Sequence, residues 1–157
     1  ILLAQNQTGL NNLFKLVSES YKSENFYRYP RMDYALLEKY GEGVIAASAC
    51  LGGVYAGNYW ENGTYDDEGN RTGVDREAAL DDMRETTRRM QAVFGDRWYG
   101  ELQWNNIKEQ HELNQLIVQI SEEFNMKLIS TADSHYPNQT AMKVIPRAKA
   151  LSMMIAW

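Results

Sequence analysis

Asp133 and His135 have the residue types and the spacing of a metal-binding or catalytic pair. They follow a short apolar run at 127–132 that is typical of a buried strand. Residues i and i+2 of a strand project from the same face, about 7 Å apart at ~3.3 Å per residue, so these two side chains should point together. Barrels of β/α units build metal and catalytic sites from such groups at the carboxyl ends of their strands. The alternative is a helix-capping aspartate beside a surface histidine.

Two other predicted strands carry groups of the same kind. Cys50 directly follows an apolar run, and Glu101 lies within another. Because the carboxyl ends of barrel strands converge, we expect Cys50, Asp133 and His135 to meet. Thiolate, carboxylate and imidazole together make a zinc or transition-metal ligand set.

Other interpretations of these residues stay open at this point. Cys50 can be a small buried residue without chemistry. A nucleophilic Cys–His pair is a further alternative, although no orienting Asn pattern accompanies it. Glu101 is a base in the layer behind the metal ligands, a direct ligand, or an ion-pair partner of Arg97 or another cation. The other histidine, His111, lies off the apolar stripe of its helix and is predicted to be a surface residue.

Strand and helix patterns alternate along the chain, and these elements must position the groups above. Strands are predicted at 1–4, 43–49, 97–103 and 127–132, and helices at 8–21, 33–40, 75–94 and 107–124. Asp33 and Asp75 are the predicted capping residues of two helices, and Gly41 and Gly95 the residues that end them.

Apolar stripes predict the buried face of each long helix. The stripes are Leu10, Leu13, Phe14, Val17 and Tyr21 on the first, Ala79, Leu80, Met83, Thr87, Met90 and Phe94 on the third, and Leu113, Leu116, Ile117, Ile120 and Phe124 on the fourth.

Three segments are predicted to lie outside these elements. Residues 22–32 form a tyrosine-rich loop, and residues 52–73 form an exposed excursion with a hairpin around Asn62-Gly63 or Glu68-Gly69. The tail from Gln139 is predicted to be partly helical, with a break or kink at Pro146.

The alternation of strands and helices predicts an α/β fold with parallel strands. The strand at 43–49 is apolar throughout, as expected for a parallel strand buried on both faces. No glycine-rich phosphate loop follows any strand, so a Rossmann fold is unsupported. A fragment of a β/α barrel fits the pattern better.

Composition and charge limit the classes of protein. The 157 residues suffice for one domain or a large part of one, and both ends are apolar, which we interpret as a cut through structured protein. A single cysteine rules out an internal disulfide and suits the cytoplasm. No apolar run approaches the ~20 residues of a membrane helix.

The net charge of −5 argues against DNA binding by the chain alone, since domains that hold DNA by themselves are usually basic. Basic residues cluster at Arg84, Arg88 and Arg89 of one helix and within 138–157. Both clusters are interpreted as solvated helix faces. Any grip on nucleic acid is therefore expected to be local or to come from other parts of a longer protein.

Six sequence runs, taken in order, carry a family resemblance. They are LLAQNQTG at 2–9, NLFKL at 12–16, YPRMD at 29–33, EGVIAASACLGG at 42–53, FGDRWYGELQ at 94–103 and STADSHY at 130–136. Together they resemble the PHP (polymerase and histidinol phosphatase) domain of the bacterial-type, C-family replicative DNA polymerase III alpha subunits.

The resemblance implies a distorted, TIM-like β/α barrel with a divalent-metal cluster (Zn, Mn or Mg) at its strand ends. It implies that Cys50, in the SACL-like motif, and Asp133 and His135, in the D-x-H-Y motif, are metal ligands, with Glu101 behind them. The remaining ligands of the family, an H-x-H pair among them, do not occur in this sequence, so the site is incomplete here. Residues 1–157 would then be the central and C-terminal part of one PHP domain, without a second domain.

The resemblance further implies part of a cytoplasmic DNA-directed DNA polymerase with a metal-dependent phosphoesterase or 3′–5′ exonuclease site. Asp133 and His135 would be its catalytic residues, and the fragment alone would be inactive. The partners would be DNA, through the full-length polymerase, and other replisome subunits, with no membrane. One alternative is a non-catalytic structural or subunit-binding module of the polymerase. Another is a small-molecule phosphatase of the PHP superfamily.

Two departures from the common pattern of the family are visible. The excursion at 55–73 is longer than usual, and the tail after Tyr136 differs. They suggest a divergent member, with a phage as a conceivable source.

Overall fold

The computed structural model describes residues 1–132 and residue 134. Its main sheet has four strands in the order β1-β4-β7-β8. The strands are β1 (Leu2–Ala4), β4 (Val44–Ala47), β7 (Trp98–Gln103) and β8 (Lys127–Thr131). β4 pairs with β7, and β7 with β8, in parallel. The α/β class with parallel strands is therefore confirmed, and the arrangement is that of a fragment of a β/α barrel.

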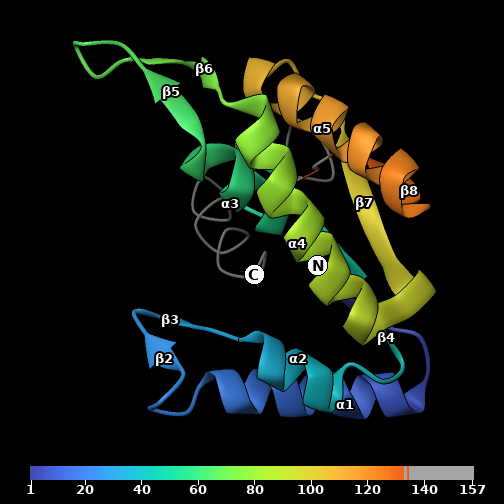
Figure 1. Ribbon diagram of the computed structural model, residues 1–157. Helices are drawn as coiled ribbons and strands as arrows, with labels where there is room; N and C mark the ends of the chain where they lie inside the picture. Colours follow the sequence, from blue (N-terminus) through green and yellow to red (C-terminus); the bar gives the residue numbers. More distant parts are fainter. Residues whose placement is uncertain (133, 135–157) are drawn as a thin grey trace, which may run out of the picture.

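The first strand runs against the other three. Between β1 and β4 the chain forms two helices, α1 (Gln7–Ser20) and α2 (Tyr34–Tyr40), which lie side by side across one end of the molecule (Figure 1). The amide of Gln5 donates to the carbonyl of Gly43 at 2.8 Å. The end of β1 thus lies beside the start of β4, and the two strands pair antiparallel.

Three helices pack on one face of the sheet, here called the core face (Figure 1). They are α3 (Val54–Glu61), α4 (Arg76–Phe94) and α5 (Lys108–Phe124). On the core face Trp98 Nε1 donates to the Tyr55 hydroxyl at 3.0 Å, and this hydroxyl lies 2.7 Å from the hydroxyl of Thr87. These contacts join β7 to α3 and α4.

The alternate residues of the strands point to the opposite face, here called the polar face after Glu101, Gln103 and Thr131. In the parallel register, Gln103 of β7 lies opposite Thr131 of β8. At the edge of this face Leu3 is 56% exposed.

The long helices α4 and α5 follow the sequence closely. All six predicted core residues of α4 are buried, and of the five on α5 only Phe124 is partly exposed. The Asp75 side chain accepts from Ala78 N at 3.1 Å, and Gly95 ends α4 with a φ of +58°. The predicted cap and stop of α4 are therefore confirmed, as are Asp33 and Gly41 for α2.

The predicted apolar stripe of α1 is wrong. Leu10, Phe14, Val17 and Tyr21 are all exposed, and only Leu13 packs against the core. The buried face of the helix instead consists of Gly9, Asn12, Leu16 and Ser20. A Cβ on Gly9 would stand 1.8 Å from the carbonyl oxygen of Gly43. Close backbone contact of this kind requires glycine and leaves no hydrophobic pattern in the sequence.

The segment at 52–73 is not wholly an exposed excursion. Its first part forms α3, in which Tyr55 and Tyr59 are fully buried. Tyrosine can be buried where its hydroxyl finds a partner, and Tyr59 donates to Glu112 at 2.5 Å. The second part is the predicted hairpin, β5 (Gly63–Tyr65) and β6 (Arg71–Val74), with Gly69 in its turn at a φ of +83°.

A second hairpin lies in the predicted loop at 22–32. It consists of β2 (Phe26–Tyr27) and β3 (Tyr29–Pro30). The tail from Gln139 lies outside the described residues. Within the described part of the chain, no helix is long and apolar enough to cross a membrane.

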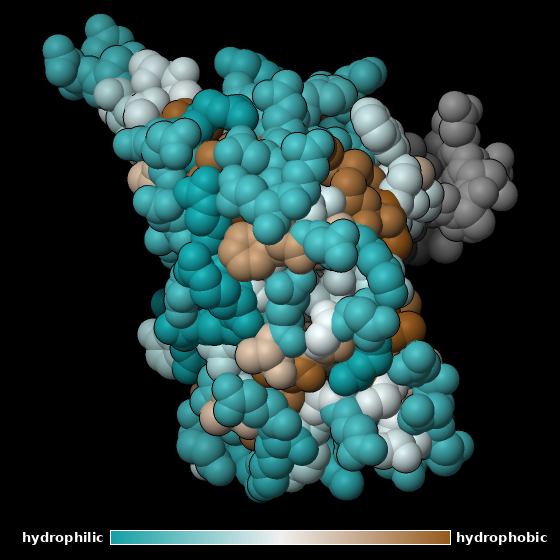
Figure 2. Space-filling model, turned by 45° about the vertical axis from the view of Figure 1, so that its right-hand side comes forward, coloured by the Kyte–Doolittle hydropathy of each residue, from teal (hydrophilic) through white to brown (hydrophobic). Residues whose placement is uncertain are grey.

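Hydrophobic residues reach the surface in a band between mainly hydrophilic regions at the top and bottom of the molecule (Figure 2). Leu128 of the edge strand β8 is 38% exposed.

Candidate functional site at the strand ends

The carboxyl ends of β4 and β7 hold two of the predicted groups. Cys50 follows β4 and is half-buried, whereas Glu101 on β7 is only 1% exposed. The amide of Glu101 donates to the hydroxyl of Ser48 at 2.8 Å, which links the two strand ends. Ala49, directly before Cys50, has a φ of +63°. A non-glycine residue in this left-handed conformation is uncommon and costs free energy, and such residues gather at functional sites.

The carboxylate of Glu101 is held on one side only. Its Oε1 accepts from the Thr131 hydroxyl at 2.7 Å and from Gln103 Nε2 at 3.2 Å. Its Oε2 is buried and has no hydrogen-bond partner among residues 1–132 and 134. A buried polar atom without a partner is costly.

Arg97 does not pair with Glu101, so an ion pair between these two residues is wrong. The Arg97 guanidinium instead donates to the backbone carbonyls of Gly41 (2.8 Å) and Val44. Within residues 1–132 and 134, Glu101 takes part in no ion pair. A pairing of Glu101 with another cation stays a prediction.

A buried amide cluster fixes the end of β7 against α5. Asn114 Nδ2 donates to the Gln103 carbonyl at 2.8 Å, and Asn114 Oδ1 accepts from Gln110 Nε2 at 2.9 Å. The side-chain oxygens of Gln103 and Gln110 are buried without partners in the described part of the chain. Gln110 and Asn114 were not predicted, because their signal in the sequence is just a pair of amides four residues apart at the start of a helix.

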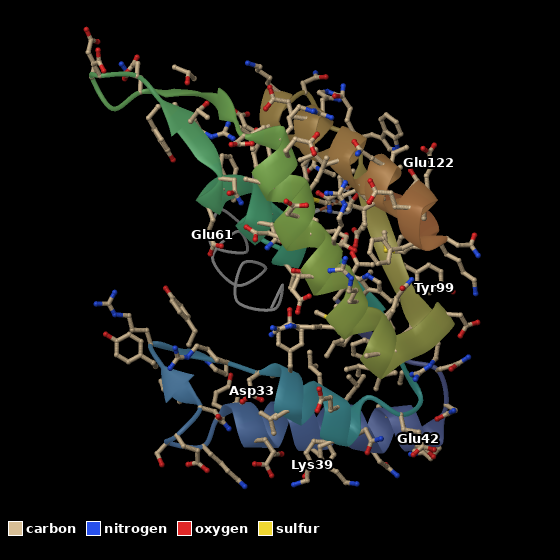
Figure 3. All side chains as sticks on the ribbon, viewed as in Figure 1. Asp33, Lys39, Glu42, Glu61, Tyr99 and Glu122 are labelled. Carbon is tan, nitrogen blue, oxygen red and sulfur yellow. The ribbon has the colours of Figure 1, made fainter. Side chains whose placement is uncertain are left out.

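Asp133 and His135 lie outside the described residues, so their convergence with Cys50 stays a prediction. Among the residues that the structure describes, no three His, Cys, Asp or Glu side chains are close enough to hold a metal ion. His111 is exposed on α5, as predicted. Tyr99, at the start of β7 and two residues before Glu101, is half-buried (Figure 3).

Comparison with known proteins gives one family and a consistent set of relatives. The family described as "PHP domain" matches residues 1–105. The DNA polymerase III subunit alpha of Aquifex aeolicus is 43% identical over 141 residues, covering 88% of this chain and 10% of that protein. The same subunit of Borreliella burgdorferi is 38% identical over 148 residues, covering 92% and 11%. That of Helicobacter pylori is 32% identical over 157 residues, covering 99% and 12%. The chain thus spans about a tenth of the length of these relatives.

Proposed function

The chain belongs to the PHP domain family, and from this premise we propose that it is part of a DNA polymerase III alpha subunit whose PHP domain cleaves phosphodiester bonds. The reaction is metal-dependent 3′–5′ exonuclease proofreading, which supports replication in the cytoplasm. The partners are DNA and other replisome subunits, as the names of the relatives suggest.

The residues at the strand ends fit a divalent cation. The buried Glu101 carboxylate with its free Oε2 is the observation that carries this proposal. Cys50 supplies a half-buried thiol beside it, and Asp133 and His135 supply a carboxylate and an imidazole. Zinc and manganese bind such donors. A bound divalent cation would activate water and offset the charge of the phosphodiester.

Each of the four proposed site residues has a defined role. Cys50, Asp133 and His135 hold the cation, together with ligands from outside this sequence. Glu101 acts behind them: Thr131 and Gln103 fix its Oε1, which leaves Oε2 to accept one further hydrogen bond. Asp133 is two residues beyond Thr131, so strand alternation is expected to place it on the polar face.

The test is a paired assay on the complete polymerase that contains this chain. Asp133→Asn keeps the side-chain volume but removes the charge, so degradation of a mismatched primer should be abolished while primer extension stays mostly intact. Asp67→Asn, in the exposed turn of the β5–β6 hairpin, is the control and should change neither activity. Unchanged degradation by a folded Asp133→Asn protein would exclude this site as the proofreader.

A structural role is the second candidate, because the exposed apolar stripe of α1 suits contact with another part of a polymerase. In that case Asp133→Asn should lower thermal stability and primer extension together, with no exonuclease activity to lose. Residues 1–157 alone should show no nuclease activity under either role, because the ligand set is incomplete.

A further inference from the structure

We propose that the β2–β3 hairpin, residues 25–32, is a contact site for single-stranded nucleic acid, with its tyrosines stacking on bases and its arginines meeting phosphates. The site lies at the free end of the β2 and β3 strands, beside Asp33 at the start of α2 (Figure 3). It is separate from the strand ends of the main sheet, and the proposal stands whether or not those strand ends cleave phosphodiesters.

The hairpin presents aromatic rings to solvent. Tyr27 and Tyr29 are 63% and 61% exposed, and Phe26 is 43% exposed. Tyr27 and Tyr29 pair directly across the two strands. Proteins that bind single strands without sequence preference place such exposed rings along a basic surface, because every base offers a face for stacking.

Two arginines stand over one of these rings. The guanidinium carbons of Arg28 and Arg31 lie 5.8 and 5.4 Å from the centre of the Tyr27 ring. Neither arginine makes an ion pair in the part of the chain that the structure describes. Arg84, in contrast, binds Asp81 at 2.6 Å and Glu123 at 2.7 Å.

The backbone holds Arg28 at the tip in an unusual conformation. Its φ is +61°, in the left-handed region that non-glycine residues rarely adopt, and it is the single residue between Tyr27 and Tyr29. Strained residues of this kind persist where the surrounding structure fixes them and often mark binding sites. The left-handed conformation of Arg28 thus places a cationic residue between two exposed rings.

The charge of the hairpin itself suits a polyanion, although the chain as a whole is negatively charged. Residues 25–32 contain two arginines and no acid, whereas the net charge of the sequence is −5. The flanking acids Glu24 and Asp33 line a pocket of about 250 Å³ with Arg31. Both acids keep their negative charge at the base of the hairpin, where Glu24 accepts from Ser23 and Asp33 caps α2. The positive charge is therefore greatest at the tip, on Arg28.

The experiment uses the complete protein and a short probe. Oligonucleotides dT20 and rU20, each containing one 5-iodouracil, are photo-crosslinked in EDTA, and the adducts are mapped by mass spectrometry. We expect adducts at Tyr27 or Tyr29 with both probes if the shared single-strand chemistry is recognised, and with dT20 alone if the site is specific for DNA. Tyr65, 59% exposed on the acidic β5–β6 hairpin, is the internal control and should form none.

Variants extend the test to affinity. The double change Tyr27→Ala and Tyr29→Ala should remove the adducts and weaken dT20 binding about 30-fold or more, whereas Tyr27→Phe with Tyr29→Phe should retain binding, because phenylalanine also stacks. Arg28→Gln with Arg31→Gln should reduce the slope of log affinity against log salt by about 1.4, at ~0.7 per phosphate contact. The control pair Arg88→Gln and Arg89→Gln, whose charges are paired with Glu85, should leave the slope unchanged.

Three results would overturn the proposal. The first is the absence of adducts on the hairpin, and the second is equal labelling of Tyr65. The third is a lower melting temperature of the alanine variant with unchanged dT20 binding, which would show that the hairpin packs against protein instead.

Discussion

The two faces of the main sheet differ in how completely their polar groups are hydrogen-bonded. On the core face every polar group near Trp98 has a partner: the indole, Tyr55 and Thr87 form a closed chain of hydrogen bonds. On the polar face, three and five residues further along β7, Glu101 and Gln103 each keep a buried oxygen that has no partner among the described residues. A satisfied face stabilises the fold, whereas buried acceptors of this kind suit the binding of a further group. Changes on the first face should therefore cost stability, and changes on the second should cost binding.

The largest effect is expected at Gly100 on the core face. A Cβ there would stand 2.8 Å from atoms of Ile117, Met126 and Leu128. Gly100→Val should lower the free energy of unfolding by ~3 kcal/mol or more through overpacking, measured by urea denaturation. Gly57→Ala is the matched control, because a Cβ on Gly57 meets nothing within 4 Å, and it should gain ~0.5–1 kcal/mol from helix propensity. Equal stability of Gly100→Val and wild type would show that α5 does not pack on β7 as described.

The next effect concerns Tyr55 and alkaline pH. Burial raises the pKa of the Tyr55 hydroxyl to about 12, with the hydrogen bonds to Thr87 and Trp98 opposing the shift. Because the folded pKa lies above the unfolded value of about 10, the protonated group stabilises the fold fully below pH 10. This contribution, ~2–3 kcal/mol, should be lost as the pH rises from 10 to 12.

Tyr55→Phe isolates this contribution. The variant should lose ~1–3 kcal/mol at pH 7, because Thr87 and Trp98 lose their partner, and its unfolding should depend less on pH between 10 and 12. Tyr65→Phe, at an exposed position, should leave both quantities unchanged. The same alkaline slope in Tyr55→Phe and wild type would contradict the assignment to Tyr55.

On the polar face the expected change is larger in metal affinity than in stability. Glu101→Gln should change the free energy of unfolding by less than ~1 kcal/mol, and Thr131→Val should lower it by ~1–2 kcal/mol, because the buried carboxylate loses a hydrogen-bond donor. Groups behind metal ligands typically contribute 10- to 100-fold to affinity, so zinc binding by the complete protein should weaken by about that factor. Ser130→Ala, next to Thr131 but on the core side of β8, where Ser130 accepts from Trp104, should leave zinc binding unchanged. Equal losses of zinc affinity in Thr131→Val and Ser130→Ala would show that the two faces do not differ in their effect on zinc binding.

The sequence predicted well where one hydrophobic pattern decides the structure. The stripe of α4 and the caps at Asp33 and Asp75 are as predicted, because they depend on side chains close together in the chain. The prediction failed for α1, whose packing depends on backbone contact at Gly9, and for α3, whose buried tyrosines depend on distant hydroxyl partners. β1 runs in the opposite direction because the two helices between β1 and β4 return the chain to the end of β1. The strand patterns in the sequence do not reveal this.

The site was predictable in part. Cys50 and Glu101 do lie at neighbouring strand ends, because parallel strands place their carboxyl ends together. The left-handed Ala49, the one-sided pairing of Glu101 and the amide cluster of α5 were not predictable, since they arise from contacts between elements. The positions of Asp133 and His135 relative to Cys50 stay a prediction.

The most direct measurement is X-ray absorption at the zinc edge of the complete, zinc-loaded protein and of its Cys50→Ser variant. We predict a sulfur atom at ~2.3 Å from the zinc ion in the wild-type protein. This sulfur should disappear in Cys50→Ser, leaving nitrogen and oxygen atoms at ~2.0–2.2 Å from the zinc. Asp133→Asn should keep the sulfur neighbour while lowering the amount of bound zinc. A wild-type spectrum without sulfur, or a sulfur signal that persists in Cys50→Ser, would contradict a metal site at the strand ends of the polar face.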